Sequence, residues 1–334
     1  MQASFKKFKA WKKELLARRP HRSFQLSRRR DYVRALELPG YIAFTHYVNK
    51  TVWSNRKLLL GLAIIYLVLF TLLIGIGSQE AYTKLTDSLK EATTSITGGD
   101  LSQLGLAGAL FVTIATVGIS DSPTESQQIY ITLLSLLIWL TTVWLLRNRL
   151  AGHAIRLRDG LYNAGAPIIP LFLVTLVLLA QLIPILLAVI GYEAATTSGL
   201  LDGGVEAMLF WIAATLLSLL SLFWATSTIF AMVIATLPGM YPMKALRNAG
   251  DLVLGRRVRI LLRWAWMFLV VVLAWAVISI PLILIDQWLK GIWPAFGNVP
   301  IIPVLLAILG TVSVIWLSSY VYLLYRKVVD GSAI

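Results

Sequence analysis

Gln181 is the one strongly polar residue inside a long apolar run of this chain, and Pro184 follows three residues later. A proline inside a helix cannot donate a hydrogen bond to the carbonyl of the preceding turn. The freed carbonyl and the Gln181 amide could together form a polar notch for a small ligand, which makes Gln181 a candidate ligand-contact residue. The alternative is an interhelical hydrogen bond beside a tolerated kink, which requires no ligand.

A second candidate site lies at residues 113–121, at the end of the apolar segment 104–119. This stretch contains, in order, Thr113, Thr116, Val117, Gly118, Ile119, Ser120 and Asp121. It resembles the potassium-channel filter, in which the carbonyls of a Thr-Val-Gly-Tyr-Gly-Asp loop replace the hydration shell of the ion. Ile119 and Ser120 depart from that pattern, because a side chain at 120 disfavours the left-handed backbone that glycine permits. The resemblance implies a cation channel of about four chains, with Thr116 and Gly118 as candidate pore residues.

The remaining sequence offers no catalytic or metal-binding pattern. The histidines, His21, His46 and His153, have no second ligand at metal spacing. We find no carboxylate pair, phosphate-binding glycine loop or nucleophile elbow, and the chain has no cysteine. We therefore expect no enzymatic activity, no cofactor and no metal site.

The N-terminal segment is a candidate lipid-binding element. Its aromatic residues fall on one face of a predicted helix, and lysines occupy much of the remainder. Such a helix lies in the headgroup layer, with its rings at the acyl boundary and its ammonium groups on anionic lipid. Nucleic acid would explain the charge but not the aromatic stripe, so we expect anionic lipids of the cytoplasmic face as partners. The candidate lipid-contact residues are Phe5, Phe8, Trp11, Lys6, Lys9, Lys12 and Lys13.

The composition requires a membrane around these elements. Of the 334 residues, 58% are hydrophobic and 14% charged, whereas a soluble domain has roughly 45–50% and about 25%. Runs of about 20 apolar residues suffice to cross the hydrocarbon core as helices. Such runs cover residues 58–77, 129–146, 168–190, 207–237, 264–285 and 301–325. The sequence thus predicts an all-α polytopic membrane protein with six transmembrane helices.

The charge distribution predicts the orientation of these spans. Apart from Lys84, Lys90 and Lys290, every Lys and Arg lies in the segments 1–57, 147–160, 237–263 and 326–334. Basic loops stay in the cytoplasm during insertion, so we expect a multi-pass protein of the cell (inner) membrane with both termini cytoplasmic. Its predicted parts are a basic cytoplasmic or interfacial N-terminal segment at 1–56, a transmembrane domain at 57–325 and a cytoplasmic tail at 326–334.

Segment 101–120 is apolar as well, yet a seventh span would reverse the sides of everything that follows it. The basic stretch 147–158 would then lie outside, and the acidic loop 193–206 inside, against the positive-inside rule. We therefore expect 101–120 to be a re-entrant or interfacial helix on the outer side. Ser122, Pro123 and Glu125 suggest a capping box at the start of the following helix.

The spans also show signs of an internal repeat. A tryptophan is followed three residues later by a hydroxyl residue near the inner ends of the returning spans, in the pairs Trp139 and Thr142, Trp224 and Ser227, and Trp316 and Ser319. Basic, partly amphipathic segments at 46–57, 147–163 and 243–263 precede the outgoing spans. The simplest interpretation is three helical hairpins, each led by a cytoplasmic amphipathic helix. The alternative is that such residues are common in any membrane helix.

One of the basic segments carries a resemblance to a known family. The segment contains Ala245, Leu246, Asn248, Ala249, Leu252, Gly255, Arg256 and Arg259, and it leads directly into a tryptophan-rich span. This pattern resembles six-span bacterial inner-membrane proteins similar to the membrane domain of glycerophosphodiester phosphodiesterases and related uncharacterised proteins. The likeness is strongest over 240–325. It implies a fold and a location, and it covers no catalytic motif.

Two functions remain open at this point. The first is a non-enzymatic role in membrane organisation, assembly or lipid interaction, with a homo-oligomer or another membrane protein as a further partner. The second is a cation channel or small-solute transporter that uses the filter-like loop at 113–121. The absence of polar machinery at membrane depth and the wealth of basic amphipathic surface favour the first.

Overall fold

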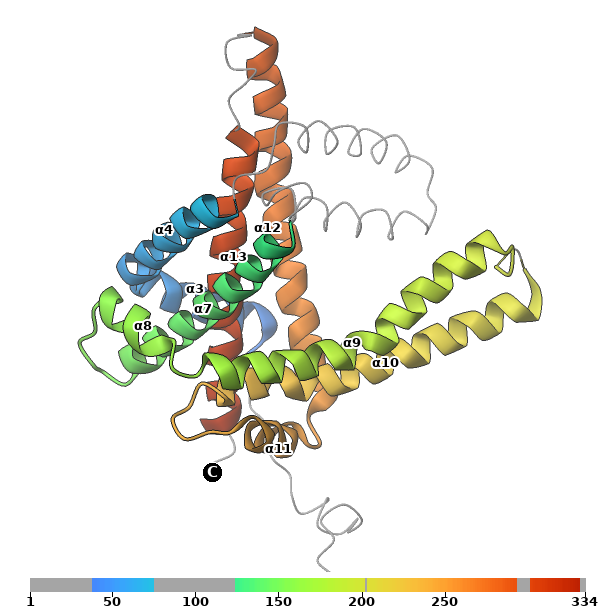
Figure 1. Cartoon of the computed structure of the whole chain (residues 1–334), viewed down its shortest axis with the longest axis horizontal. Coiled ribbons are helices and arrows are strands. Elements are labelled where there is room, and N and C mark those ends of the chain that lie inside the picture. Colours follow the sequence, from blue (N-terminus) through green and yellow to red (C-terminus); the bar gives the residue numbers. More distant parts are fainter. Residues whose placement is uncertain (1–37, 75–123, 202, 293–300, 331–334) are drawn as a thin grey trace, which may run out of the picture. The chain divides into compact units, whose positions relative to one another are not determined.

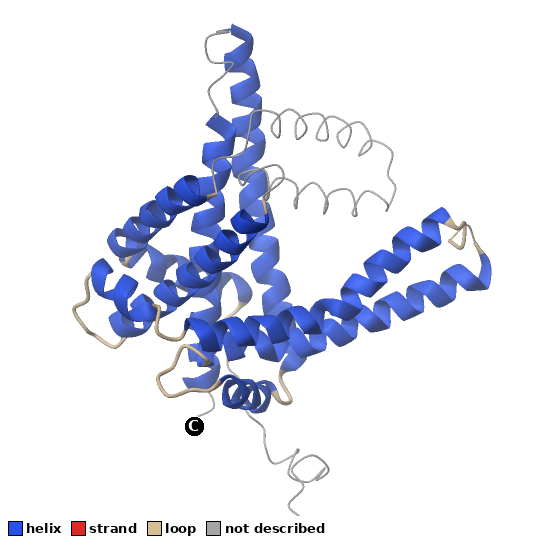
Figure 2. Cartoon of the chain, in the orientation of Figure 1, coloured by secondary structure: helices blue, strands red, loops and turns tan. Residues whose placement is uncertain are grey.

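The protein is helical throughout the part that the structure describes. The computed structural model describes residues 38–74, 124–201, 203–292 and 301–330, which form helices and short connections without any strand (Figures 1 and 2). Six of these helices are long and apolar enough to cross a bilayer. The predicted all-α class with six potential membrane spans is therefore confirmed for the described residues.

The long helices follow the predicted apolar runs but extend beyond most of them. They are α4 (Arg56–Leu73), α7 (Glu125–Leu150), α9 (Ile168–Thr197), α10 (Gly204–Ile234), α12 (Arg257–Ile292) and α13 (Ile301–Asp330). A helix of 30 residues, such as α9, is about 45 Å long, whereas the hydrocarbon core is only about 30 Å thick. Helical structure thus continues past the apolar stretch that hydropathy alone detects.

The helix α7 starts differently from the prediction. Thr124 is its N-cap, and a capping box joins Thr124 to Gln127, with the Thr124 amide donating to Gln127 Oε1 at 2.8 Å. The predicted cap residue Ser122 lies outside the described residues, and Glu125 is the first helical residue instead of the third. The Thr-x-x-Gln spacing satisfies two amides reciprocally, which Ser122 and Glu125 could match only if the helix began earlier. Gln127 Nε2 also donates to the Ile74 carbonyl at 2.8 Å, joining α7 to the end of α4.

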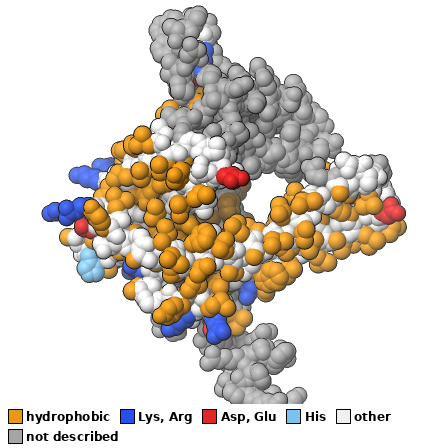
Figure 3. Space-filling model, in the orientation of Figure 1, with side chains coloured by type: hydrophobic (Ala, Val, Ile, Leu, Met, Phe, Trp, Pro, Cys, Tyr) orange, Lys and Arg blue, Asp and Glu red, His pale blue; other side chains and the backbone are white. Residues whose placement is uncertain are grey.

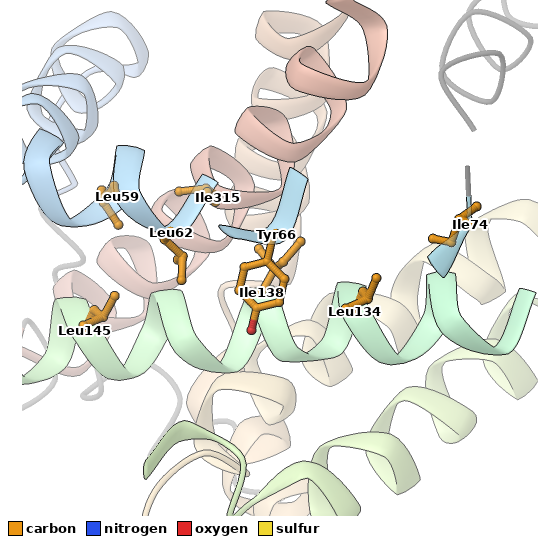
Figure 4. Close-up of a cluster of buried hydrophobic side chains, with 8 residues drawn as sticks. All are labelled: Leu59, Leu62, Tyr66, Ile74, Leu134, Ile138, Leu145 and Ile315. Atoms are coloured by element: carbon orange, nitrogen blue, oxygen red, sulfur yellow. The ribbon is translucent and has the colours of Figure 1, made fainter. Parts of the chain in front are cut away.

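The long helices that follow one another in the described chain pack together. Between α4 and α7 the contact is apolar, and the Tyr66 and Thr141 hydroxyls share a 3.0 Å hydrogen bond within it. Figure 4 shows the cluster of buried side chains at this contact, to which α13 adds Ile315. The cluster consists of Leu59, Leu62, Tyr66, Ile74, Leu134, Ile138, Leu145 and Ile315. Between α12 and α13, a second cluster contains Val271, Trp275, Ile283, Ile302 and Leu306, and Trp275 Nε1 donates to Ser313 Oγ at 2.8 Å.

The contact between α9 and α10 is built differently, because α10 turns small side chains toward α9. Ser221, Ala225 and Thr228 are buried on α10 at helical spacing. Small residues let two helix backbones approach closely inside a membrane, where the hydrophobic effect gives little attraction between helices. Most large apolar side chains of these two helices remain exposed in the described structure, as expected for helices that face lipid.

Three short helices pack across the ends of the long ones. The first, α3 (Tyr41–Ser54), reaches α12 and α13 through Trp266 Nε1, which donates to Thr45 Oγ1 at 3.0 Å, and Trp316 Nε1, which donates to Asn49 Oδ1 at 2.8 Å. The second, α8 (Leu157–Ala164), packs on α7 and α4. The third, α11 (Pro242–Val253), packs on α10 and α9.

Candidate functional site

Gln181 lies near the middle of α9 and faces α10. Its Oε1 atom accepts a hydrogen bond from Thr228 Oγ1 at 2.6 Å. One turn further along α9, the Ile185 amide, which follows Pro184, donates to Ser221 Oγ at 3.2 Å. The interhelical hydrogen bond expected as the alternative to a ligand site is therefore present. Contact between Gln181 and a ligand stays a prediction.

The other candidates from the sequence lie outside the described residues. Among them are the filter-like loop 113–121 with Thr116 and Gly118, the segment 101–120, and the N-terminal residues from Phe5 to Lys13. The channel hypothesis and the N-terminal lipid-binding helix thus stay predictions. Of the histidines, His46 and His153 are described, and both are exposed. The described residues contain no group of three or more His, Asp or Glu side chains that could hold a metal ion.

Arginines at the ends of the long helices bind main-chain carbonyls. Arg147 Nη1 donates to the Thr236 carbonyl, just after α10 ends, at 3.0 Å. Arg257 Nη1 donates to the Phe223 carbonyl at 2.8 Å, and its guanidinium lies 3.8 Å from the centre of the Phe223 ring. Guanidinium groups that stack on rings and bind carbonyls can hold charge at the edge of an apolar region. These arginines therefore join neighbouring helices where the apolar stretches end.

Arg263 of α12 is buried, with only 5% of its surface exposed. It donates through Nη2 to the Pro39 carbonyl, and its guanidinium lies 4.5 Å from the centre of the Tyr41 ring and 5.6 Å from that of Phe44. Phe44 in turn packs edge-on against Tyr320 of α13, with ring centres 4.9 Å apart. A buried cation that relies on rings and a carbonyl depends strongly on its neighbours. Arg263 therefore fixes the start of α3 against α12.

A further group of cations gathers where α3 ends and α4 begins. Arg149, in the last turn of α7, donates through Nε to Asn55 Oδ1 at 3.3 Å, and Asn55 is the residue that separates α3 from α4. Arg56 and Lys57 begin α4, and the Arg56 guanidinium lies 5.3 Å from the centre of the Trp53 ring. Trp53 is 69% exposed, and the three cations are exposed as well. We call Trp53, Arg56, Lys57 and Arg149 the basic corner.

Each short helix repeats this combination of charge and large apolar side chains. On α8, exposed Arg158 accompanies exposed Tyr162, and on α11, exposed Lys244 accompanies exposed Met243. The opposite faces are buried: Gly160 and Ala164 on α8, and Ala245, Ala249 and Val253 on α11. Figure 3 shows Lys and Arg side chains at the margins of the broad hydrophobic surface of the described residues. Cations that border exposed apolar side chains suit the headgroup layer of a membrane.

Sequence reasoning missed the basic corner and one buried acid. Arg147 and Arg149 were recognisable as the end of a span, but nothing in the sequence pairs Arg149 with Asn55. Asp286 lies just beyond the predicted span 264–285, yet α12 continues through it, and its side chain is buried with Oδ2 2.8 Å from Lys290 Nζ. The four-residue spacing of Asp286 and Lys290 was the signal that could have revealed this pair.

Scans of protein-family models, of curated proteins and of solved structures found no match to this chain. The likeness to the membrane domain of glycerophosphodiester phosphodiesterases therefore stays a prediction.

Proposed function

We propose that this protein is a non-enzymatic, multi-pass protein of the inner membrane that acts in membrane organisation or assembly by binding anionic lipids at its cytoplasmic face. The observation that carries the proposal is the composition of the short helices α3, α8 and α11. Each exposes a cation beside a large apolar side chain: Lys50 with Trp53, Arg158 with Tyr162, and Lys244 with Met243. Cations and amphipathic rings at the headgroup level attract anionic lipids.

The use of the polar side chains within the long helices supports a structural role. Tyr66 with Thr141, Gln181 with Thr228, and Trp275 with Ser313 form hydrogen bonds between helices. Such bonds hold membrane helices together, and a group engaged in one is less available to a substrate. This favours a packed scaffold over a transport path along these three contacts.

The proposed architecture is three repeated units, each a short amphipathic cytoplasmic helix followed by a helical hairpin. The units would be α3 with α4 and α7, α8 with α9 and α10, and α11 with α12 and α13. Two observations support it. Each short helix packs on the hairpin of another unit: α8 on α4 and α7, α11 on α9 and α10, and α3 on α12 and α13. The chain also repeats Leu-x-Asn-Ala-Gly at 161–165, where α8 ends with Gly165 as its C-cap, and at 246–250 within α11.

The proposed function is tested by the lipids that copurify with the full-length protein. After extraction in a mild neutral detergent, mass spectrometry compares the ratio of anionic to zwitterionic lipid bound to the protein with the ratio in the source membrane. We expect anionic lipid to be enriched about five-fold or more, since each cation near the surface contributes roughly 1 kcal/mol. A bound ratio equal to that of the membrane, or turnover of lipid or uptake of solute by the protein in vesicles, would contradict the proposal.

A further inference from the structure

The basic corner brings together cations from two helices that are distant in the sequence. Arg149 comes from the end of α7, while Arg56 and Lys57 come from the first turn of α4. The hydrogen bond from Arg149 Nε to Asn55 Oδ1 holds the arginine beside this turn. That bond uses one of the five N–H donors of the guanidinium. The remaining donors of an exposed side chain are free to bind an anion.

Acidic side chains do not neutralise this corner within the described structure. No ion pair with an acid is found for Arg56, Lys57 or Arg149 in residues 38–74 and 124–201. The acid on the neighbouring helix α8 is Asp159, and its Oδ2 atom accepts from the Arg156 amide at 2.9 Å as part of the α8 capping box. Three cations without an acidic partner among the described residues attract an anion that can accept several hydrogen bonds, such as a phosphate group. Guanidinium groups bind phosphate through paired hydrogen bonds.

The surface next to the corner distinguishes a lipid from a free phosphate. Following Arg56 at four-residue intervals along α4, the side chains are Leu60, Ile64, Val68 and Leu72, and all of them are exposed. Residues four apart along a helix form a ridge that is inclined by about 26° to the helix axis. The apolar face formed by these four side chains thus winds along α4, away from the cations and toward the membrane interior. At its charged end, exposed Trp53 lies beside Arg56, as tryptophan does at membrane interfaces.

We propose that the basic corner binds the phosphate group of an anionic phospholipid, with an acyl chain lying along the face formed by Leu60, Ile64, Val68 and Leu72. This inference deepens the proposed lipid interaction and rests on it. It adds a defined site on the described residues to the general attraction of a basic surface. Basic pockets between membrane helices on the cytoplasmic side are known to hold lipid headgroups in this way.

The test measures lipid binding to the full-length protein in neutral detergent by native mass spectrometry. The probes are phosphatidylglycerol and phosphatidylcholine with the same acyl chains. The corner variant carries Arg56→Gln, Lys57→Gln and Arg149→Gln, and the matched control removes three exposed cations that belong neither to the corner nor to the pairs named above, through Arg156→Gln, Arg247→Gln and Arg259→Gln. Circular dichroism verifies that both variants keep the helical content of the parent.

We expect the parent to bind one phosphatidylglycerol molecule tightly and phosphatidylcholine weakly. The corner variant should bind phosphatidylglycerol about a hundredfold more weakly, since each cation contributes roughly five-fold, whereas the control should keep the tight site. Excess inorganic phosphate should leave the lipid bound, and dihexanoyl phosphatidylglycerol should bind more weakly than the long-chain lipid.

The experiment distinguishes a failure of the lipid site at the basic corner from a failure of the general lipid interaction. Equal phosphatidylglycerol binding by the parent and the corner variant would overturn the site and leave the general lipid interaction standing. The same holds if only the control loses binding. Displacement by inorganic phosphate without any dependence on acyl length would overturn the lipid assignment in favour of a phosphate site. A parent that does not prefer phosphatidylglycerol to phosphatidylcholine would overturn both proposals.

Discussion

At the scale of single residues, Gln181 shows how one polar side chain fits inside a long apolar helix. Its carbonyl oxygen accepts from Thr228, and the nearby Ile185 amide is bound by Ser221. Both partners are buried on α10. A polar group in hydrocarbon costs free energy unless it is hydrogen-bonded, so Gln181 and Pro184 are tolerated because α10 supplies hydroxyl groups at the matching positions.

The hydrogen bond between Thr228 and Gln181 predicts that mutations of the two residues are non-additive. Thr228→Val should lower the free energy of unfolding in detergent by about 0.5–2 kcal/mol, because it removes the donor to Gln181. Adding Gln181→Leu should restore part of that loss, since the unmatched amide is then gone. Thermal unfolding of both single variants and the double variant measures the coupling.

The control for this pair is Thr175→Val. Thr175 lies on α9, the helix that carries Gln181, but its hydroxyl donates to the Leu171 carbonyl in the preceding turn of that helix and not to α10. Additive effects of Thr228→Val and Gln181→Leu, or an equal loss from Thr175→Val, would contradict the proposed role of the bond between α9 and α10.

At the scale of elements, the short helices are held by specific contacts with long helices. α3 is bound by Trp266, Trp316 and Arg263. α8 approaches α7 closely at Gly160, where an added Cβ would lie 2.7 Å from Leu145 Cδ2. These contacts position the exposed cations of the short helices relative to the ends of the apolar helices.

Replacing Trp266 and Trp316 with phenylalanine should loosen α3. The rings are kept, but the indole N–H groups that bind Thr45 and Asn49 are lost. We expect amide hydrogen exchange in α3 to rise about ten-fold, since two hydrogen bonds contribute roughly 1–2 kcal/mol together. Trp288→Phe is the control, because Trp288 is exposed. Unchanged exchange in α3 would show that these bonds do not hold the helix.

Two glycine substitutions should act in opposite directions. Gly160→Ala is expected to destabilise the protein by about 1–3 kcal/mol, because buried Leu145 must move to make room. Gly250→Ala in α11 meets no neighbouring atom within 4 Å, so it should stabilise by about 0.5–1 kcal/mol through helix propensity. Thermal unfolding compares the two. If the Gly160→Ala variant were as stable as the Gly250→Ala variant, α8 would not approach α7 closely at Gly160.

At the scale of the whole molecule, the sequence predicts the helices better than their contacts. Hydropathy locates all six potential spans, because a bilayer demands a run of apolar residues. It misplaces helix ends: the apolar run ends at 190 whereas α9 reaches Thr197, and the run of α12 begins at 264 whereas the helix begins at Arg257. Polar residues beyond the hydrocarbon core stay helical without any apolar signature.

The contacts themselves were not predictable for a physical reason. Periodicity identifies a helix and its apolar face, but it does not identify the helix that covers that face. Pairs such as Arg149 with Asn55, and Gln181 with Thr228, join residues separated by 94 and 47 positions. The candidate pore loop and the N-terminal lipid helix lie outside the described residues, so the sequence remains their only support.

Sidedness is the claim on which both proposals depend, and cysteine labelling in intact cells tests it most directly. The chain has no cysteine, so single substitutions report without background. A membrane-impermeant maleimide should label Ser198→Cys, between α9 and α10, from outside. It should label Arg158→Cys and Arg247→Cys only after the membrane is permeabilised. Labelling of Arg158→Cys or Arg247→Cys in intact cells would place the basic helices outside and contradict the proposed lipid-binding face.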